Sequence, residues 1–211
     1  MLTWDLQNAF YNDSIKTICG CDEAGRGPLA GPVFAAAVIL PKDHVIEGLY
    51  DSKRLSKKKR DLLFDKIRSE AVAYSIAHAE VYEIEAINIL NASMLAMRRA
   101  IDMLYITPDL ALIDGNIARD FHIPAKPVIK GDGKIPCIAA ASILAKVSRD
   151  MFCKDMDRFY PGYGFERNKG YATKEHKAAI LKLGPCPVHR RSFLRKTLGE
   201  KYDEQDIWQS W

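Results

Sequence analysis

The sequence lacks the marks of several common protein classes. No apolar run approaches the ~18 residues that cross a membrane, and no basic stretch followed by an apolar one opens the chain. Internal repeats and low-complexity linkers are also absent from the 211 residues. We therefore expect no membrane span and no secretory signal, and a single cytoplasmic domain that acts as a monomer.

Cysteine is scarce and badly spaced for disulfides or zinc. The five cysteines are an odd number, Cys19 and Cys21 are too close for a CxxC pair, and the other three are scattered. No cluster of histidine and cysteine offers a zinc site. We expect reduced, buried thiols, as is usual in the cytosol.

The charge is modest, whereas apolar residues are plentiful. A net charge of +4 is compatible with phosphate-bearing partners but does not require them. Hydrophobic residues make up 48% of the chain, enough for a sizeable core. Composition alone therefore does not decide between an enzyme and a binding protein.

The apolar pattern predicts strands mixed with helices. Strands are expected over 16–22, 32–40, 71–79, 110–113 and 127–129, helices over 56–69, 82–105 and 136–158, and two short helices after 161. This order predicts an α/β fold with a central mixed sheet flanked by helices. Residues 16–160 would form the core, 161–198 a small helical appendage on it, and 199–211 a short tail.

Acidic residues stand where three of these strands end. Asp22 and Glu23 close the first strand, and Asp114 and Asp132 close two later ones beside a glycine. Loops at strand ends bring distant residues together in such sheets. Four carboxylates at one place would repel one another unless cations neutralised them, and oxygen ligands suit Mg²⁺ or Mn²⁺. A pair of such ions can hydrolyse a phosphodiester.

A purely structural interpretation of these acids stays open. Asp-Gly and Gly-Asp pairs are common in turns, so Asp114 or Asp132 taken singly is more typical of a turn. The adjacent pair Asp22-Glu23 gains nothing structurally at the end of an apolar strand. The joint pattern therefore favours a metal site built on all four carboxylates.

A glycine turn, Gly25-Arg26-Gly27, follows the acidic pair. With the residues after it, this turn fits the loose dinucleotide-binding pattern, but that pattern requires a helix next and residues 32–40 read as a strand. Without a Cβ, glycine lets a sugar-phosphate chain approach the backbone closely. Backbone contact near a ribose is one way to sense its 2′-hydroxyl.

Basic and aromatic side chains supply candidates for binding a nucleic acid. Lys53 and Lys130 each sit in an expected loop beside a small residue and are the better phosphate candidates, whereas residues 57–60 fit a solvated helix face. Tyr171, in a glycine-containing loop, could stack on a sugar or base. For Tyr163 and Phe165 packing on the core is favoured. Other basic residues that could follow a phosphate chain are Lys146, Arg149, Arg167, Lys169, His189, Arg190 and Arg191.

Several ordered segments resemble bacterial ribonuclease HII. The match begins with Asp22-Glu23-Ala24-Gly25-Arg26-Gly27-Pro28-Leu29-Ala30-Gly31-Pro32-Val33. It continues through Asp51-Ser52-Lys53, residues 88–97, Ile113-Asp114-Gly115-Asn116, Lys130-Gly131-Asp132, residues 139–150, Asn168-Lys169-Gly170-Tyr171-Ala172-Thr173 and His189-Arg190-Arg191-Ser192-Phe193. The resemblance covers about residues 16–198.

This resemblance implies an RNase H-like fold and metal-dependent cutting of the RNA strand of RNA–DNA hybrids. It also implies cutting beside a single ribonucleotide in duplex DNA, the first step of ribonucleotide excision. The family's metal ligands fall on Asp22, Glu23, Asp114 and Asp132, its ribonucleotide-sensing turn on residues 25–27, and its sugar-stacking tyrosine on Tyr171. Ribonuclease HIII fits less well, since it lacks the arginine turn and carries an N-terminal extension.

Three questions stay open on the sequence. Another RNase H-like nuclease, such as a junction resolvase or transposase, is a rival enzyme, against which the glycine turn and Tyr171 argue. A non-enzymatic nucleic-acid binder is the rival from a different class, against which the complete acidic set argues. The tail ends in aromatics, Trp208 and Trp211, but has no clear pattern for binding a sliding clamp.

Overall fold

A five-stranded mixed sheet forms the centre of the molecule, which is described by a computed structural model over residues 2, 4–49 and 55–198. The strand order is β3-β2-β1-β4-β5. The strands are β1 (Ile18–Ala24), β2 (Val33–Ile39), β3 (Ala73–Ala79), β4 (Leu110–Asp114) and β5 (Ala125–Val128). Strands β1, β2 and β3 pair antiparallel, whereas β4 and β5 run parallel to β1. The predicted mixed sheet is confirmed.

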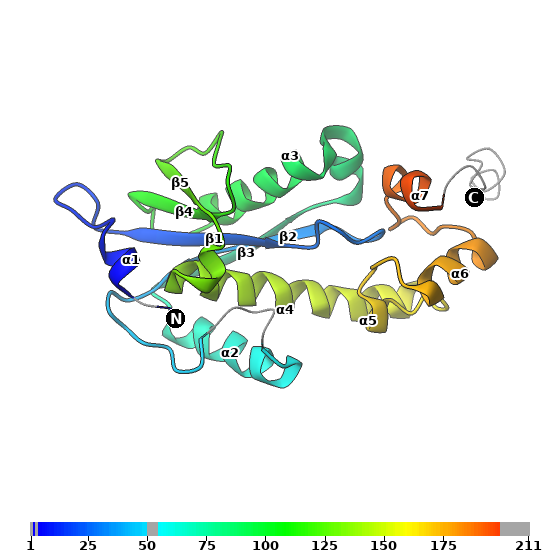
Figure 1. Cartoon of the computed structure of the whole chain (residues 1–211), viewed down its shortest axis with the longest axis horizontal. Helices are drawn as coiled ribbons and strands as arrows, with labels where there is room; N and C mark the ends of the chain where they lie inside the picture. The colour runs from blue at the N-terminus through cyan, green and yellow to red at the C-terminus, as the bar shows by residue number, and fades with distance from the viewer. Residues whose placement is uncertain (1, 3, 50–54, 199–211) are drawn as a thin grey trace.

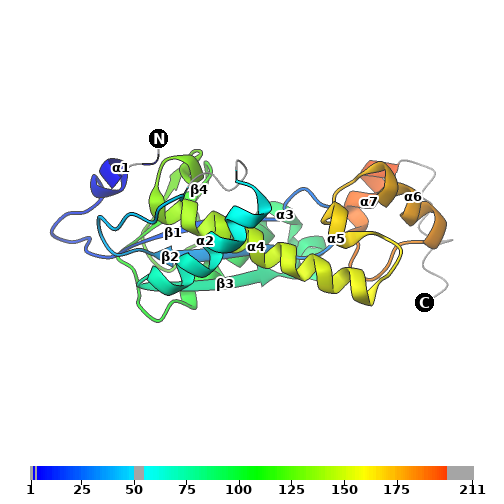
Figure 2. The same cartoon turned by 90° about the horizontal axis from the view of Figure 1, so that it is seen from below.

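Helices cover both faces of this sheet (Figure 1). They are α1 (Trp4–Asn8), α2 (Lys57–Glu70), α3 (Val81–Asp102), α4 (Pro136–Phe159), α5 (Phe165–Asn168), α6 (Lys174–Leu183) and α7 (Arg191–Leu198), with a 3₁₀ turn, η2, at Gly131–Gly133. Helix α3 packs on one face, and α4, backed by α2, packs on the other. Helices α5, α6 and α7 gather beyond one end of the sheet, as the view from below also shows (Figure 2).

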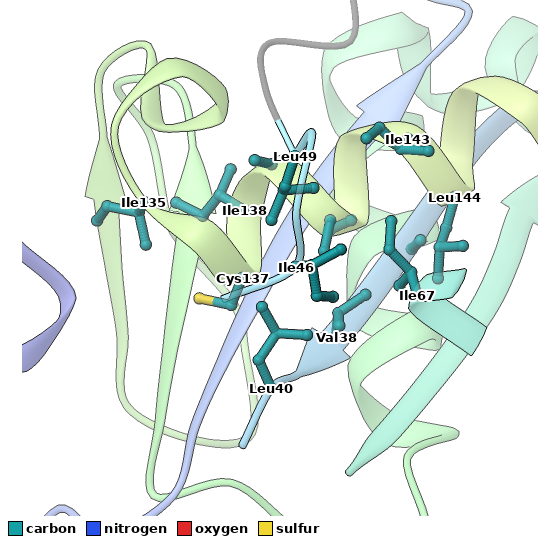
Figure 3. Close-up of a cluster of buried hydrophobic side chains, with 14 of the residues drawn as sticks. Val38, Leu40, Ile46, Leu49, Ile67, Ile135, Cys137, Ile138, Ile143 and Leu144 are labelled. Carbon is teal, nitrogen blue, oxygen red and sulfur yellow. The ribbon is translucent and has the colours of Figure 1, made fainter. Parts of the chain in front are cut away.

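The alternation of side chains along the strands divides the core between the two faces. Ile18 and Leu112 point to the α4 side, where they join a cluster with Ile138 and Leu144 that Figure 3 shows in part. Cys19 and Ile113, each one residue away from these, point to the α3 side. Because side chains alternate between the two faces, the face on which each residue near a strand end lies is also determined.

Gly20 lets α4 approach the sheet closely. A Cβ at this position would lie 2.3 Å from the backbone carbon of Cys137 and 2.3 Å from the nitrogen of Ile138. The small residues Ala139 to Ala141 on the same helix are fully buried. The run of small residues near the start of this helix predicts close packing from the sequence alone, and the structure confirms it.

Three details differ from expectation. The apolar pattern of residues 56–69 predicts that Leu62 is buried with Leu63, Phe64 and Ile67, but Leu62 is 64% exposed and the buried stripe of α2 runs through the other three. Helix α3 is broken at Asn88, whose φ of 65° and ψ of 165° are not helical. The part after residue 161 has three short helices where two were expected.

The buried thiols agree with the sequence prediction, and so does the start of α2, where a serine just before the helical pattern predicts an N-cap. All five cysteines are free and buried. Ser56 caps α2, since its hydroxyl accepts a hydrogen bond from the N–H of Lys59. Within the described ranges, no helix combines the length and the apolar character needed to span a bilayer.

Candidate active site

Asp22 and Asp114 lie together on the α4 face of the sheet. Cys21 pairs with Ile113 across the parallel strands β1 and β4, so the two aspartates follow at neighbouring positions. Each is two residues from a side chain or glycine that faces α4, which places both on that face. The topology therefore brings together two acids that are 92 positions apart in the chain.

Asp22 is a buried carboxyl among like charges. It is 4% exposed. Burial raises the pKa of Asp22 well above its usual range, and the neighbouring charges of Glu23 and Asp114 raise it further. Hydrogen bonds from the Ser142 hydroxyl and from the N–H of Glu23, at 2.7 Å, oppose that rise in part. The charged form of Asp22 is therefore disfavoured unless a cation neutralises it.

Glu23 connects the acids to the glycine turn. Its carboxylate lies 3.2 Å from the guanidinium of Arg26. Burial raises the pKa of Glu23, Arg26 lowers it, and Asp114 raises it. Because Arg26 is largely exposed and Glu23 is not, this ion pair spans from the acidic cluster to the surface.

Asp132 approaches the cluster through the backbone. Asp114 accepts a hydrogen bond of 2.7 Å from the N–H of Gly131 and one of 3.4 Å from the N–H of Asp132. Lys130, just before, adopts the left-handed conformation, with φ of 55°. These bonds hold the η2 turn against the end of β4, so the backbone of Asp132, a residue that is 5% exposed, lies beside the carboxylate of Asp114.

The residue types of the acidic cluster suit a divalent cation, but their side chains are not arranged around a common point. Among the described residues, no three side chains of histidine, cysteine, aspartate or glutamate are arranged so that they could already hold a metal. Oxygens of Asp22, Glu23 and Asp114 instead accept hydrogen bonds from Glu23, Arg26 and Gly131. A hard cation fits this set, because its ligands would all be carboxylate oxygens and their mutual repulsion would be relieved.

A cleft of about 360 Å³ opens between the acidic pair and the C-terminal part. It is lined by Asp22, Glu23, Ala24, Gly25, Arg60, Ser142, Lys146, Arg149 and Tyr171. The ring of Tyr171, 46% exposed, lies 3.5 Å from where a Cβ on Gly27 would be. The structure thus brings Tyr171 to the glycine turn across about 145 residues of sequence.

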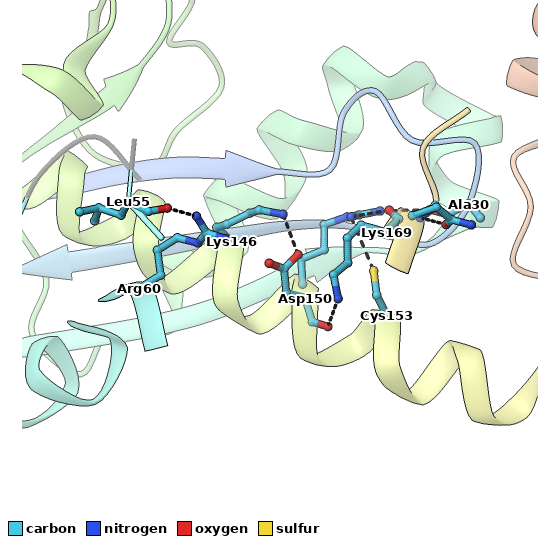
Figure 4. Close-up of polar contacts among 10 residues, drawn as sticks. Ala30, Leu55, Arg60, Lys146, Asp150, Cys153 and Lys169 are labelled. Carbon is cyan, nitrogen blue, oxygen red and sulfur yellow. Dashed lines mark hydrogen bonds and ion pairs between the residues drawn. The ribbon is translucent and has the colours of Figure 1, made fainter. Parts of the chain in front are cut away.

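Ser142 and Arg60 belong to the site although the sequence does not assign them to it. In the sequence Ser142 is only part of a small-residue stretch, and its contact with Asp22 depends on how α4 crosses the sheet. Arg60 fits a solvated helix face by its sequence, yet its side chain donates to the carbonyl of Leu55 and lines the cleft (Figure 4). Neither contact has a local sequence signal.

The expected basic track is only partly at the surface. Lys146 pairs with Asp150 at 2.6 Å, and Lys169 approaches the Asp150 carbonyl (Figure 4). Arg149, His189 and Arg190, however, are 1%, 1% and 0% exposed. Their expected place along a phosphate chain is therefore wrong. Charged side chains seldom lie in a core, so their burial here runs against the usual expectation.

The remaining candidates lie at the surface, in the core or outside the described residues. Lys130 is exposed next to the η2 turn. Tyr163 and Phe165 are buried and stack on each other with ring centroids 5.4 Å apart, as packing predicts. Lys53 and the tail, residues 199–211, lie outside the described residues. A larger cleft of about 840 Å³, between α3 and the C-terminal part, is lined by His189 and Arg191 but by none of the four acids.

Comparison with known proteins gives one family. The profile of the family described as Ribonuclease HII matches residues 19–196. A ribonuclease HII of Caldicellulosiruptor saccharolyticus is 51% identical over 195 residues, which cover 92% of this chain and 95% of that protein.

Solved structures with the same fold extend this result. The ribonuclease H2 of Pyrococcus horikoshii OT3 matches with a TM-score of 0.72 at 25% identity, over 86% of this chain and 97% of that one. The structure of Bst-RNase HIII in complex with Mn²⁺ matches with a TM-score of 0.61 at 16% identity, over 81% of this chain and 71% of that one. At the latter identity the likeness concerns the fold.

Proposed function

The chain belongs to the ribonuclease HII family, and we propose that it nicks duplex DNA 5′ of a single embedded ribonucleotide. It is a ribonuclease H with the predicted RNase H-like fold, and the family supports endonuclease activity on RNA–DNA hybrids. We propose in addition that a single ribonucleotide is a substrate, that divalent metal ions are required, and that named residues bind the metal and the substrate.

One observation carries the proposal. The acidic pair and the glycine turn are walls of the same cleft, with Tyr171 against the turn. A ribose held against Gly27 and Tyr171 would place its neighbouring phosphate toward Asp22. Recognition of the sugar and cleavage of the adjacent bond would thus occur at one place, without any need for a longer stretch of RNA.

Divalent cations, Mg²⁺ or Mn²⁺ and in our proposal two of them, would be held by Asp22, Glu23, Asp114 and Asp132. When bound, they would supply a nucleophilic water near neutral pH and stabilise charge on the departing oxygen. Support comes from the all-oxygen set, from the repulsion that raises the pKa of Asp22, and from the Mn²⁺ bound by a protein of the same fold.

The other residues of the cleft would bind and orient the substrate. Gly25, Arg26 and Gly27 let the nucleic-acid backbone approach the protein, and the aromatic face of Tyr171 stacks on the sugar. Lys130, which is exposed beside Asp132, and Lys53, which lies outside the described residues, would each contact a phosphate in our proposal. Hydrolysis by an activated water leaves a 3′-hydroxyl and a 5′-phosphate.

The test is to map the cut on an end-labelled duplex that contains one ribonucleotide, with Mg²⁺, with Mn²⁺ and with chelator. We expect one cut on the 5′ side of the ribonucleotide, ends of the stated kind, and no cut with chelator. A cut on the 3′ side that leaves a cyclic phosphate would instead mean that the 2′-oxygen itself attacks, and the proposal would be wrong. Binding without any cut would favour a non-enzymatic role.

A further inference from the structure

Arg190 lies beneath the loop that joins β1 to β2, defined here as residues 25–32, and is fully buried. Its guanidinium donates hydrogen bonds to the carbonyls of Gly25 at 2.7 Å, Arg26 at 3.1 Å, Pro28 at 2.9 Å and Gly31 at 2.7 Å. One side chain therefore binds four carbonyls of a single loop. The contact joins residues more than 150 positions apart in the chain.

Arg190 has no carboxylate partner in the part of the chain that the structure describes. Within the described part of the chain, no acidic oxygen lies close enough to Arg190 to form an ion pair. Burial and the neighbouring charge of Arg149 lower the pKa of Arg190 to about 9, so it is still charged at neutral pH. Because a buried charge without a counter-ion is costly, the convergence of carbonyl dipoles on the guanidinium must offset that cost. The conformation of the loop thus depends on the hydrogen bonds that its carbonyls accept from Arg190.

Neighbouring contacts fix the rest of the same loop. The backbone N–H of Arg190 donates to the carbonyl of Leu29 at 2.7 Å. Arg149 donates to the carbonyl of Ala30 at 3.1 Å, and its side chain lies where a Cβ on Gly25 would be. The carbonyls of this loop thus point inward.

The direction of these carbonyls sets the direction of the N–H groups. In a trans peptide the C=O of one residue and the N–H of the next point opposite ways. Because the carbonyls of Gly25 and Arg26 point to Arg190, the N–H groups of Arg26 and Gly27 point away from it. Neither N–H has a hydrogen-bond partner among the described residues, and both residues are exposed. They are donors turned outward.

We propose that Arg190 is a positioning residue that presets the N–H groups of Arg26 and Gly27 as donors to the 2′-oxygen of a ribose. This inference rests on the proposed function, in which the glycine turn reads the sugar. Arg190 does not touch the substrate. It acts by binding the carbonyls of Gly25 and Arg26. This contact keeps the Gly25–Arg26 and Arg26–Gly27 peptides in the orientation in which their N–H groups can bind the ribose.

The first experiment compares Arg190→Lys with Arg158→Lys, at an arginine of α4 whose side chain is 80% exposed, as a matched control. Lysine keeps the charge but loses the planar fork that binds several carbonyls at once. We expect kcat/KM on the one-ribonucleotide duplex to fall about 10–100-fold for Arg190→Lys, as for other small displacements of a binding group. Arg158→Lys should match the wild type. A folded Arg190→Lys with wild-type kcat/KM would overturn the inference.

The second experiment begins with the wild-type protein, so its first result does not depend on whether a variant folds. The amide signals of Arg26 and Gly27 are followed by NMR in metal-free buffer while a duplex is added. We expect both signals to shift with a one-ribonucleotide duplex and not with its all-DNA twin, and the shift to disappear in Arg190→Lys. Amides that respond equally to both duplexes would contradict the inference.

The two proposals fail in different ways. If the wild type cuts the one-ribonucleotide duplex no better than its all-DNA twin, the proposed function is wrong. If the wild type discriminates between them and Arg190→Lys, folded by its Tm, discriminates as well, only the role of Arg190 is wrong.

Discussion

Asp22, two residues before the end of β1, and Asp114, the last residue of β4, lie on the same face of two adjacent parallel strands, and burial together with the charges of Glu23 and Asp114 raises the pKa of Asp22. Both acids sit where the fold would be more stable without one of the charges. A substitution that removes the charge but keeps the shape therefore separates the stability of the fold from its activity.

Asp22→Asn should lose activity and keep or gain stability. We expect cleavage of an RNA–DNA hybrid with Mg²⁺ to fall by more than about 100-fold, since even groups that merely orient metal ligands are worth 10–100-fold. The Tm should stay equal or rise, because asparagine keeps the hydrogen-bonding shape without the repulsion. Kinetics and thermal denaturation on the same preparation measure both.

The matched control is Asp109→Asn. Asp109 accepts hydrogen bonds of 2.8 Å from the N–H groups of Lys16 and Thr17, and these bonds lower its pKa. This variant should lower the Tm and keep the activity, the opposite result. If Asp22→Asn keeps wild-type cleavage while folded, the metal site is misplaced.

The order of the strands along the chain, the acids at their ends and the glycine turn could be predicted from residues alone. Strands β1 and β4 follow from short alternating or apolar runs, and acids at the ends of those runs stand out. Asp22 and Asp114 could thus be named without knowing which strands pair.

The roles of Arg149, Arg190 and Ser142 could not be predicted in this way. Each depends on a contact between segments that no local pattern connects. A buried arginine looks in sequence like any surface arginine, and its carbonyl partners are backbone groups that every residue has. The kink at Asn88 has no sequence signal for a related reason, since the apolar period continues on both sides of it.

Tyr171→Ala should weaken cutting at a single ribonucleotide about tenfold, in line with the usual loss when one stacking contact is removed. Tyr171→Phe keeps the ring face and should be close to wild type. Tyr105→Ala, at another exposed tyrosine, is the control. Steady-state rates on the one-ribonucleotide duplex test this prediction. Equal rates for Tyr171→Ala and the control would refute the stacking role of Tyr171.

Gly20→Ala should damage the fold. The added methyl group would meet the backbone of Cys137 at 2.3 Å, and backbone in a packed helix cannot move aside cheaply. We expect a loss of about 3 kcal/mol or more in the free energy of unfolding. Gly27→Ala is the comparison, because its methyl group would make an ordinary contact of 3.5 Å with Tyr171. Chemical denaturation should find Gly27→Ala near wild type; similar losses would contradict the account of how α4 packs.

His189 should make the protein acid-sensitive. It packs among His176, Cys186 and the rings of Tyr163 and Phe165. Burial, and then His176, lower the pKa of His189 from 6.5 to about 3. Between these values the unfolded chain binds a proton that the folded chain does not. The free energy of unfolding should therefore fall as the pH drops below about 6.5, by up to about 1.4 kcal/mol per pH unit for this group.

Urea denaturation at pH 7, 6 and 5 measures the slope of the free energy of unfolding against pH. His189→Gln should be less stable at pH 7 but should show a flatter slope. His122→Gln, at a histidine whose side chain is 77% exposed, should leave the slope unchanged. A wild-type slope in His189→Gln would mean that other groups cause the acid sensitivity.

The central claim is that one cleft both recognises a ribose and cuts next to it. Its most direct test is the ratio of kcat/KM for two duplexes that differ only in one 2′-oxygen, measured with Mg²⁺. We predict rapid cutting of the duplex with the ribonucleotide and no measurable cutting of its all-DNA twin. Equal cutting of the two would contradict the claim.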